Sequence, residues 1–558
     1  MIDWSHLRYL VIEDSPTMRT WLRNAIIGMG GKSIDVASGY SDALYRICNR
    51  EPFDIIISDY ILSENSHLTT SGGQRVVSRD GQHLLEECRQ RKLIPSSCVF
   101  VMVTGESAYE RVFAVAELAP DDYLLKPLTP GILAERLSLA HERSQALKPL
   151  TDRIDQDDFG GCLDSARQYL IEHKRHHLEV RRLIGDCLLK LGRFEEAHRH
   201  FAEILREHPH LPWARIGDAR SYFALDQYDE SRDLLEALVK DQADFVQAHD
   251  LLARVHEAKG SPERSRALLK EVLAKNPRAV HRHREVIRMA LDLGDNQEAC
   301  AAYEQMFLYG TGSVAVSPAD FSGFSTLLLN DPTPKAKERL TQLISVLNDH
   351  YVKSSVDQSD DYRLAELIAQ FSRAKIEGKT AESQRYYQQI ASIERDRPSV
   401  DNNARMAMMK VAAAAGDDYA AAEIARRVMA DYHGNENMQA RIVRDLEAAG
   451  LRELAATIGA ESDRAMLELN QEAVGLAKQG AMRKAMDEFI RLADSTRNLS
   501  VTFNAALAIV RWLEDHPGDE SLASKLRHYL EVIINRDPDN PRTRQLREMS
   551  GAVLRASD

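Results

Sequence analysis

Five positions in the first quarter of the sequence carry side chains that could do chemistry together. Each lies at the end of a short apolar run: Glu13, Asp14, Asp59, Thr104 and Lys126. Taken singly, such a carboxylate usually caps a helix or a turn, and a Lys-Pro pair usually marks a loop. Three carboxylates, a hydroxyl and an amine become a reactive site only if the fold brings them to one place.

The apolar runs themselves predict such a fold. Short β-branched runs alternate with amphipathic stretches, which is typical of a parallel sheet with crossover helices. In a doubly wound sheet of this kind, ligands bind beyond the carboxyl ends of the strands. The reactive side chains should therefore converge on one rim of an α/β domain. We expect strands at Leu7–Ile12, Ser33–Ala37, Phe53–Ser58, Val99–Val103 and Asp122–Leu125.

Beyond about residue 146 the strand pattern ends and an internal repeat of 34 residues begins. A fixed period of this length is the signature of a helical solenoid. Glycine at an inter-helix turn supplies a left-handed backbone, and small side chains let paired helices approach closely. Three kinds of position recur with this period. The turn positions are Gly192, Asp226, Gly260 and Gly294; the small positions are Ala197, Ser231, Ser265 and Ala299; the large apolar positions are Phe201, Leu235, Leu269 and Tyr303.

These columns resemble tetratricopeptide repeats. The segment Leu178–Leu211 matches that family's pattern best, although Arg181 stands where the family usually has a large aromatic residue. This copy is therefore divergent. The residues that carry the match are Gly185, Gly192, Phe194, Ala197, Phe201 and Pro209.

Helical pairs resume in the C-terminal half, with turns expected at Gly378, Gly416 and Gly480. Ala485 and Phe489 follow Gly480 at the offsets that Ala197 and Phe201 keep from Gly192. We predict an all-α helical-repeat solenoid behind the α/β domain. The predicted domains are 1–145, the α/β domain; 146–312, a first repeat block; 313–363, an irregular and partly helical connection; and 364–558, a second repeat block with a C-terminal cap.

The N-terminal domain resembles the CheY-like receiver domains of two-component response regulators. The motifs are Glu13-Asp14 after the first strand, Asp59 in FDIIISDY, Thr104 in VMVTGES and Lys126 in DDYLLKP. The resemblance implies a flavodoxin-like fold in which Asp59 is the phosphoacceptor. Lys126 would pair with one phosphoryl oxygen, and Thr104 would donate its hydroxyl to another.

The same resemblance implies a magnesium site. A carboxylate that attacks a phosphoryl group meets its negative charge, which a hard cation such as Mg²⁺ can neutralise. Glu13, Asp14 and Asp59 would hold this cation. The backbone carbonyl of Ile61, two residues after the nucleophile, would complete the set.

A switch is implied as well, with Thr104 and Tyr123 as its two members. The threonine would move toward the phosphoryl group and the aromatic ring would turn inward behind it, which biases a domain with two states. The peptide bond between Lys126 and Pro127 would be cis, the usual X-Pro exception.

One loop departs from the family's pattern by its length. Ser63–Asp80 reads SENSHLTTSGGQRVVSRD, which is polar and contains glycine, and it lies beside Asp59 in the sequence. Loops this long are either surface insertions or functional. We interpret it as a surface insertion; the alternative is a part in gating or partner contact.

Composition excludes several functional classes. The net charge of -13 argues against a duplex-binding surface, which needs clustered cations. Six scattered cysteines without CxxC spacing favour unpaired thiols in a reducing compartment, so we expect a cytoplasmic protein. No apolar run reaches the length needed to span a bilayer, so membrane insertion is not expected.

Two basic clusters remain, His173–His177 and His281–Arg284. They suggest a metal or nucleic-acid site, but both lie in the repeat array, where solvated helix faces are the favoured interpretation. No GxxxxGK[ST], HExxH or GxSxG element appears in the repeats. We therefore predict a phosphoacceptor regulator without a catalytic output domain.

The functional prediction is a response regulator with a tetratricopeptide output. A histidine kinase or phosphotransfer protein would load Asp59, and the receiver would promote its own phosphotransfer and dephosphorylation. Stacked helix pairs form a concave groove, suited to a protein or peptide partner. Phosphorylation would either release the receiver from the solenoid or create a dimer. The alternative is a constitutive scaffold whose receiver is only structural.

Overall fold

The chain divides into two compact units. The first comprises Met1–Ala224, Tyr228–Arg282 and Met306–Val316, and the second comprises Leu225–Gln227, His283–Gln305 and Ser317–Asp558. The computed structural model describes residues 2–62, 81–105 and 120–557, apart from short gaps at 244, 278, 311–312, 314, 330–333, 355–358, 397–400, 432–435, 496–498, 517–518 and 537–539.

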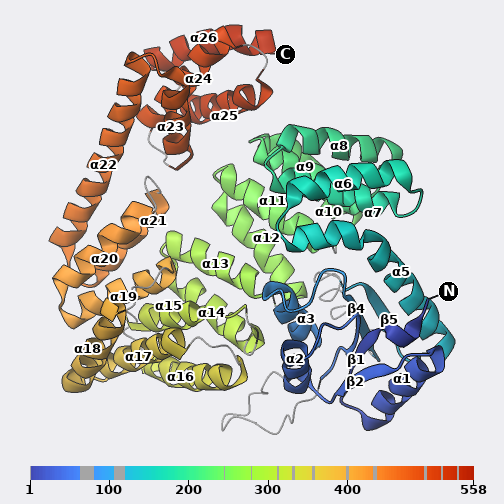
Figure 1. The fold of residues 1–558 in the computed structure, drawn as a ribbon. Helices are drawn as coiled ribbons and strands as arrows, with labels where there is room; N and C mark the ends of the chain where they lie inside the picture. The colour runs from blue at the N-terminus through green and yellow to red at the C-terminus, as the bar shows by residue number, and fades with distance from the viewer. Residues whose placement is uncertain are drawn as a thin grey trace. The chain divides into compact units, whose positions relative to one another are not determined.

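The first unit begins with a parallel sheet of five strands in the order β2-β1-β3-β4-β5 (Figure 1). This is the predicted doubly wound α/β fold, and each predicted strand is confirmed with its ends shifted by at most two residues. The strands are β1 (Arg8–Ile12), β2 (Ser33–Ala37), β3 (Ile55–Asp59), β4 (Val99–Thr104) and β5 (Asp122–Leu125), joined by helices α1 (Pro16–Met29), α2 (Tyr40–Asn49) and α3 (Gly81–Gln90).

Both faces of the sheet are covered, which explains why its strands are almost continuously apolar. Alternate side chains of β1 point to opposite faces. Leu10 and Ile12 pack into the core under α2 and α3. Tyr9 and Val11 pack into the core under α1 and the last receiver helix, α5 (Pro130–Asp155).

Helix α5 belongs to two hydrophobic cores. It begins at Pro130, where Thr129 caps it by accepting a hydrogen bond from the Ile132 amide. Leu133 and Leu137 near its start are buried against the sheet. Leu147 and Leu150, three turns further on, are buried in the core of the first repeat helices. One continuous helix therefore crosses the domain boundary predicted at residue 145.

The loop before β4 is fastened to the end of the same helix. Ser96 donates from its backbone amide and its hydroxyl to Asp155, at 2.8 and 2.5 Å. The Ser144 hydroxyl donates to the Ser97 carbonyl at 2.5 Å, and Lys92 pairs with Asp157 just beyond the helix at 3.1 Å. These contacts make the receiver and the start of the solenoid adjoining parts of one unit.

Antiparallel helix pairs follow, as the 34-residue period predicts. All four turn positions, Gly192, Asp226, Gly260 and Gly294, have positive φ. The small column is fully buried in each repeat, and the large apolar column is almost so. The helices are α6 (Phe159–Glu172), α7 (His177–Lys190), α8 (Phe194–Glu207), α9 (Pro212–Ala224), α10 (Tyr228–Asp241), α11 (Val246–Ala258), α12 (Pro262–Lys275), α13 (Val280–Asp292) and α14 (Asn296–Gly310).

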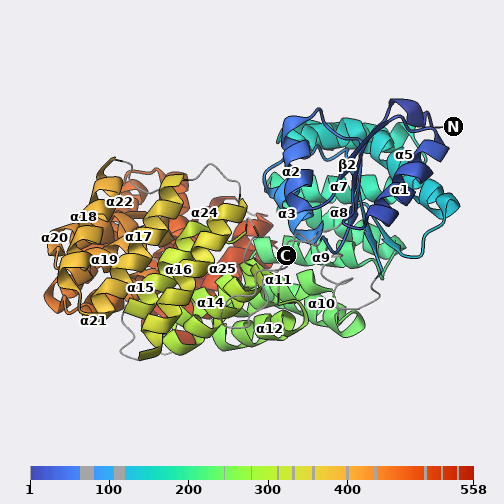
Figure 2. The same ribbon diagram turned by 90° about the horizontal axis from the view of Figure 1, so that it is seen from below.

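The second unit continues with helices that pack side by side (Figure 2). Gly378, Gly416 and Gly480 have the positive φ expected of turns, and Ala485 and Phe489 are buried as their offsets predict. The helices are α15 (Pro318–Leu329), α16 (Pro334–Ser354), α17 (Ser359–Ile376), α18 (Thr380–Asp396), α19 (Asn402–Ala415), α20 (Asp418–Asp431), α21 (Glu436–Ala448), α22 (Arg452–Lys478), α23 (Met482–Ser495), α24 (Leu499–Asp515), α25 (Glu520–Arg536) and α26 (Pro541–Ser557).

The predicted connection at 313–363 contains two of these helices, α15 and α16. Phe321 and Leu328 of α15 are fully buried, and α15 packs on α17 and α19. The division of the solenoid into two blocks remains a prediction.

A turn glycine should resist substitution even where space is available. Gly294 has φ +76°, and a Cβ built on it would meet nothing within 4 Å. Because a left-handed backbone disfavours any Cβ, Gly294→Ala should lower the free energy of unfolding by about 1 kcal/mol. Gly475 of α22 is equally open but helical, so Gly475→Ala should instead raise stability by up to about 1 kcal/mol. Denaturant titration measures both; equal effects would contradict the backbone explanation.

Candidate functional site

The reactive side chains lie at the carboxyl edge of the sheet because neighbouring parallel strands end together. Ile12 pairs with Ser58 across β1 and β3, so Glu13 and Asp14 emerge beside Asp59. Thr104, the last residue of β4, pairs with Leu125 of β5, and Lys126 follows it. The expected convergence on one rim is confirmed by this register.

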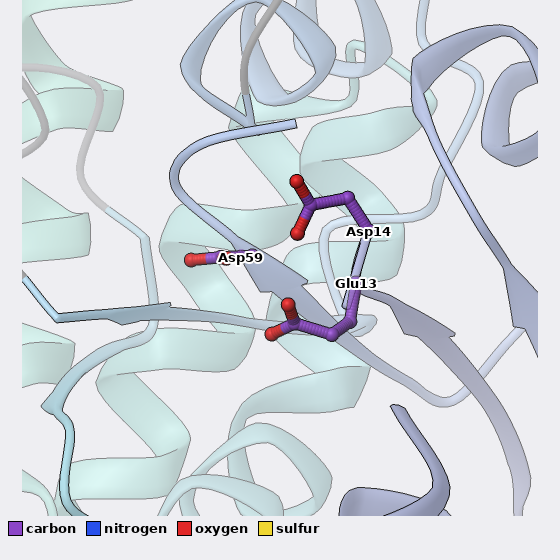
Figure 3. Close-up of side chains that lie close together, drawn as sticks. All are labelled: Glu13, Asp14 and Asp59. Atoms are coloured by element: carbon purple, nitrogen blue, oxygen red, sulfur yellow. The ribbon is translucent and has the colours of Figure 1, made fainter. Parts of the chain in front are cut away.

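Three carboxylates form an acidic cluster. Each of Glu13, Asp14 and Asp59 offers an oxygen, and these oxygens all lie within 4.8 Å of one another. Figure 3 shows Glu13 and Asp14 extending from one segment and Asp59 from the end of the neighbouring strand. Glu13 is 1 % exposed and Asp59 is 7 % exposed, so their charges are largely removed from water.

Lys126 supplies the positive charge that this cluster needs. Its ammonium group lies 2.8 Å from Glu13 Oε2 and 3.1 Å from Asp59 Oδ2. Burial would lower the Lys126 pKa, but the hydrogen bond to Glu13 and the charge of Asp59 raise it. The lysine therefore stays protonated between two carboxylates.

One ammonium group does not fully offset the buried negative charge. Burial and the charge of Asp59 together raise the pKa of Glu13 to about 7, although the hydrogen bond from Lys126 opposes them. Burial likewise raises the pKa of Asp59, which Lys126 again opposes. Carboxylate oxygens whose negative charge is only partly neutralised are the ligands that a hard divalent cation prefers. The residues present therefore fit Mg²⁺.

The other predicted site residues lie on or next to β3, β4 and β5. Thr104 is 1 % exposed at the end of β4. Tyr123 lies on β5 with its ring partly buried against the core under α2 and α3. Ile61 is exposed, two residues beyond Asp59. The peptide bond between Lys126 and Pro127 is cis, as the resemblance implied.

Two residues that shape the rim were not identified from the sequence. Arg19 of α1 donates to the backbone carbonyl of Glu13 at 2.6 Å and to that of Asp14 at 3.3 Å, and so fixes the acidic segment. Gly81, the first residue of α3, presses on the Asp59 carbonyl so closely that a Cβ would collide with it. Arg19 stands five residues after Asp14 and could have been suspected; Gly81 gave no local signal.

Some sequence predictions fall on residues outside the described part of the chain. The long loop Ser63–Asp80 is one of them; the description stops at Leu62 and resumes at Gly81. Its interpretation as a surface insertion or a gating element remains a prediction.

The two basic clusters have different outcomes. His173, Lys174 and Arg175 lie exposed between α6 and α7, as a solvated face requires. The solvated interpretation is wrong for Arg282, which is fully buried in α13. Its guanidinium makes two bonds to the Asp250 carboxylate, at 2.7 and 2.9 Å, so a charge partner compensates its removal from water.

Comparison with known protein families agrees with this geometry. Residues 9–138 match the model of the response regulator receiver domain. Residues 188–255 and 251–309 each match a tetratricopeptide repeat model. The chain carries a receiver domain followed by tetratricopeptide repeats.

The receiver domain is also similar to individual proteins. A chemotaxis protein CheY homolog of Campylobacter jejuni is 24% identical over 131 residues, which is 24% of this chain and 89% of the relative. A solved CheY-like receiver domain protein from Methanospirillum hungatei is 19% identical and covers 25% of this chain and 96% of its own, with a TM-score of 0.21. A two-component response regulator from Clostridium difficile is 23% identical, with coverages of 25% and 98% and a TM-score of 0.21.

The matches to family models indicate the general class of function. A receiver domain indicates a two-component response regulator, and the repeats suggest an output through protein interaction. This combination fits a phosphoacceptor regulator better than a classical enzyme. Within the described residues, none of the helices combines the length and apolar character needed to cross a membrane.

Proposed function

We propose that this protein is a response regulator in which phosphorylation of Asp59 controls the binding of a protein or peptide partner by the solenoid. The observation that carries the proposal is the position of Lys126, whose ammonium group bridges Glu13 and Asp59 at the rim of the sheet. A buried carboxylate beside a fixed cation is a suitable acceptor for a transferred phosphoryl group.

The phosphodonor in this proposal is a histidine kinase or a phosphotransfer protein. An Asp59 oxygen attacks the phosphorus in line, the bond from phosphorus to the donor nitrogen breaks, and the imidazole leaves. Lys126 then pairs with one phosphoryl oxygen and the Thr104 hydroxyl donates to another. The same rim would promote attack by water on the acyl phosphate and so limit its lifetime.

Mg²⁺ would be held by Glu13, Asp14 and Asp59, with the Ile61 carbonyl as a further ligand. When bound, it neutralises the phosphoryl oxygens during transfer. The fit rests on three carboxylate oxygens within 4.8 Å of one another.

Mg²⁺ should therefore stabilise the receiver. A cation that binds only the folded state adds about 1.4 kcal/mol at ten times its Kd. We expect a rise in the Tm of the wild type with Mg²⁺ and the loss of most of this rise in Asp59→Asn. Sodium chloride at equal ionic strength controls for screening. An equal rise in both proteins would place the cation elsewhere.

The switch would pass from the rim to the solenoid through β4, β5 and α5. Thr104 and Tyr123 form the proposed switch pair on β4 and β5. Helix α5 packs beside these strands and continues into the core of α6 and α7. A change in how α5 lies on the sheet would therefore reach the first repeats directly.

Beryllofluoride, a stable phosphoryl analogue, tests the coupling. We expect Mg²⁺ with beryllofluoride to change amide hydrogen exchange in α5 to α8 of the wild type and not in Asp59→Asn. Small-angle scattering of the same samples separates two versions: release of the receiver raises the radius of gyration at constant mass, whereas dimerisation doubles the mass. No response in exchange or scattering would favour the constitutive scaffold.

A further inference from the structure

A short stretch at the end of the first repeat block contacts the receiver. Met306–Val316, the end of α14 and the residues after it, belongs to the first unit, whereas the residues on either side belong to the second. Within this stretch the Ser313 hydroxyl donates to the Glu86 carboxylate of α3 at 3.1 Å, across 227 positions of the chain. The first unit therefore joins the receiver to the repeats at a place far along the chain from α5.

Ser313 is held in a compact turn and is hidden from water. It is 2 % exposed, and its hydroxyl oxygen accepts a hydrogen bond from the Ala315 amide at 3.1 Å. Its backbone amide donates to the Gly310 carbonyl at 2.9 Å, and its carbonyl accepts from the Val316 amide at 3.2 Å. Buried hydroxyl groups nearly always have a partner. Separation from Glu86 would therefore leave this donor unpaired unless the turn opened to water.

Helix α3 links this contact to the phosphorylation site. Its first residue, Gly81, donates to the Tyr60 carbonyl at 2.9 Å, and a Cβ placed on Gly81 would lie only 2.3 Å from the Asp59 carbonyl oxygen. Glu86 lies on the same helix, between one and two turns further on. Because this close approach leaves no free space, a movement of the Asp59 backbone has to be transmitted to α3.

The far end of α3 is fixed to the start of the repeats. Lys92, just beyond the helix, pairs with Asp157 at 3.1 Å, and Ser96 in the following loop is bound to Asp155. A helix that is fixed at its far end and displaced at its start must tilt or rotate. The position of Glu86 relative to Ser313 would then change.

We propose that the hydrogen bond between Glu86 and Ser313 is a latch that holds the receiver on the repeats until Asp59 is phosphorylated, and that phosphorylation weakens this latch through α3. The inference rests on the proposed function, because it names how the acceptor site controls the solenoid. The latch lies where the chain passes from the first unit to the second, since Val316 ends one and Ser317 begins the next stretch of the other. It forms a second route beside α5.

Affinity for beryllofluoride measures the latch. A contact that exists only in the unphosphorylated state opposes phosphorylation, and linkage requires that its removal favour the phosphorylated state by the same factor. In calorimetric titrations of the full chain with Mg²⁺, Ser313→Ala should therefore lower the Kd for beryllofluoride at least about fivefold. Glu86→Gln keeps an acceptor oxygen and loses only the charge, so it should lower the Kd by a smaller factor, about two- to threefold.

Ser372→Ala is the matched control. Ser372 is also buried, but its hydroxyl donates to the Ile368 carbonyl within α17, at 2.9 Å. It should leave the Kd for beryllofluoride unchanged. Thermal unfolding without Mg²⁺ shows whether each variant is folded, and Glu86→Gln keeps the test available if Ser313→Ala is not.

Amide hydrogen exchange gives a readout that does not depend on affinity. The amides of Ala315 and Val316 both donate to Ser313, so their exchange reports on the turn. Mg²⁺ with beryllofluoride should speed this exchange in the wild type and leave it unchanged in Asp59→Asn. In Ser313→Ala it should be fast before beryllofluoride is added.

Two results would overturn the latch. One is a Kd for Ser313→Ala that equals or exceeds that of the wild type, and the other is exchange at Ala315 and Val316 that beryllofluoride does not change. A wild type that binds no beryllofluoride would instead reject the proposed function, and the latch with it. Failure of the latch alone, with beryllofluoride bound normally, is therefore distinguishable from failure of the phosphorylation proposal.

Discussion

Asp59→Asn should abolish acyl-phosphate formation in this protein. In Mg²⁺ with acetyl phosphate or phosphoramidate, intact mass should show a single added phosphoryl group on the wild type and none on the variant. The physical reason is that an amide lacks the charged nucleophilic oxygen that lies 3.1 Å from the Lys126 ammonium group. We expect a loss of at least about 100-fold in rate, as when a key catalytic group is removed.

Asp54→Asn is the matched control for this experiment. Asp54 precedes the same strand at its opposite end, where its carboxylate accepts a hydrogen bond from the Arg8 amide at 2.8 Å. It should be phosphorylated like the wild type, because it lies away from the rim. Persistence of the adduct in Asp59→Asn would move the phosphoacceptor to a neighbour such as Asp14. The absence of any adduct on the wild type, whatever the donor, would favour the constitutive scaffold.

Phe201→Ala should cause the largest loss of stability among single changes in the first repeats. Its side chain is 1 % exposed, and its ring occupies the space beside Gly185 of α7 and Gly217 of α9, where a Cβ would collide with it. Loss of a fully buried phenyl ring costs about 3–5 kcal/mol, since the backbone can collapse only partly into the cavity.

The cost should be local, because each repeat contacts mainly its neighbours. Native-state hydrogen exchange resolves this, and we expect protection to fall in α7 to α9 while the receiver sheet keeps its own. Phe223→Ala offers a comparison, since Phe223 is the same residue type but only partly buried. If Phe201→Ala lowered the free energy of unfolding no more than Phe223→Ala, the Phe201 ring would not be the main packing contact between α7, α8 and α9.

The site at the rim could be predicted well from the sequence because its reactive residues lie at the ends of recognisable strands. Glu13, Asp59, Thr104 and Lys126 each follow a run whose length and β-branched residues define a strand, so their meeting needs only the rule that parallel strands end together. The repeat columns were predictable for a similar reason. Packing of one helix pair on the next imposes the same residue type at the same phase, as the positive φ of Asp226 shows at a position otherwise held by glycine.

Features that depend on distant contacts were not predictable. Gly81 is required only because α3 begins against the Asp59 carbonyl, and no local pattern reports that approach. Arg282 was wrongly placed on a solvated face because its partner, Asp250, lies 32 residues earlier in the chain. The extent of α5 was hidden as well, since Pro149 lies inside this helix and an internal proline usually ends or kinks one.

The divergent Arg181 also acquires an explanation from the structure. It pairs with Glu207 at 2.5 Å, and Arg215, one repeat later, pairs with Asp241 at 2.7 Å. Both pairs join residues 26 positions apart, from the first helix of a repeat to the end of its second helix. An ion pair that repeats with the period therefore occupies the place where the family usually has an aromatic contact.

The number of residues in helix α5 sets the rotation of the first repeats, about the axis of this helix, relative to the receiver sheet. An α-helix turns through about 100° and rises about 1.5 Å per residue. A residue inserted between Leu137 and Leu147 would therefore rotate the solenoid's buried face by more than a quarter turn relative to the sheet, and both cores could not be satisfied together. Seven inserted residues would bring the faces back to within about 20°. Natural length variation in this stretch should thus occur in whole pairs of turns, which would leave a periodic signature in the lengths of related chains.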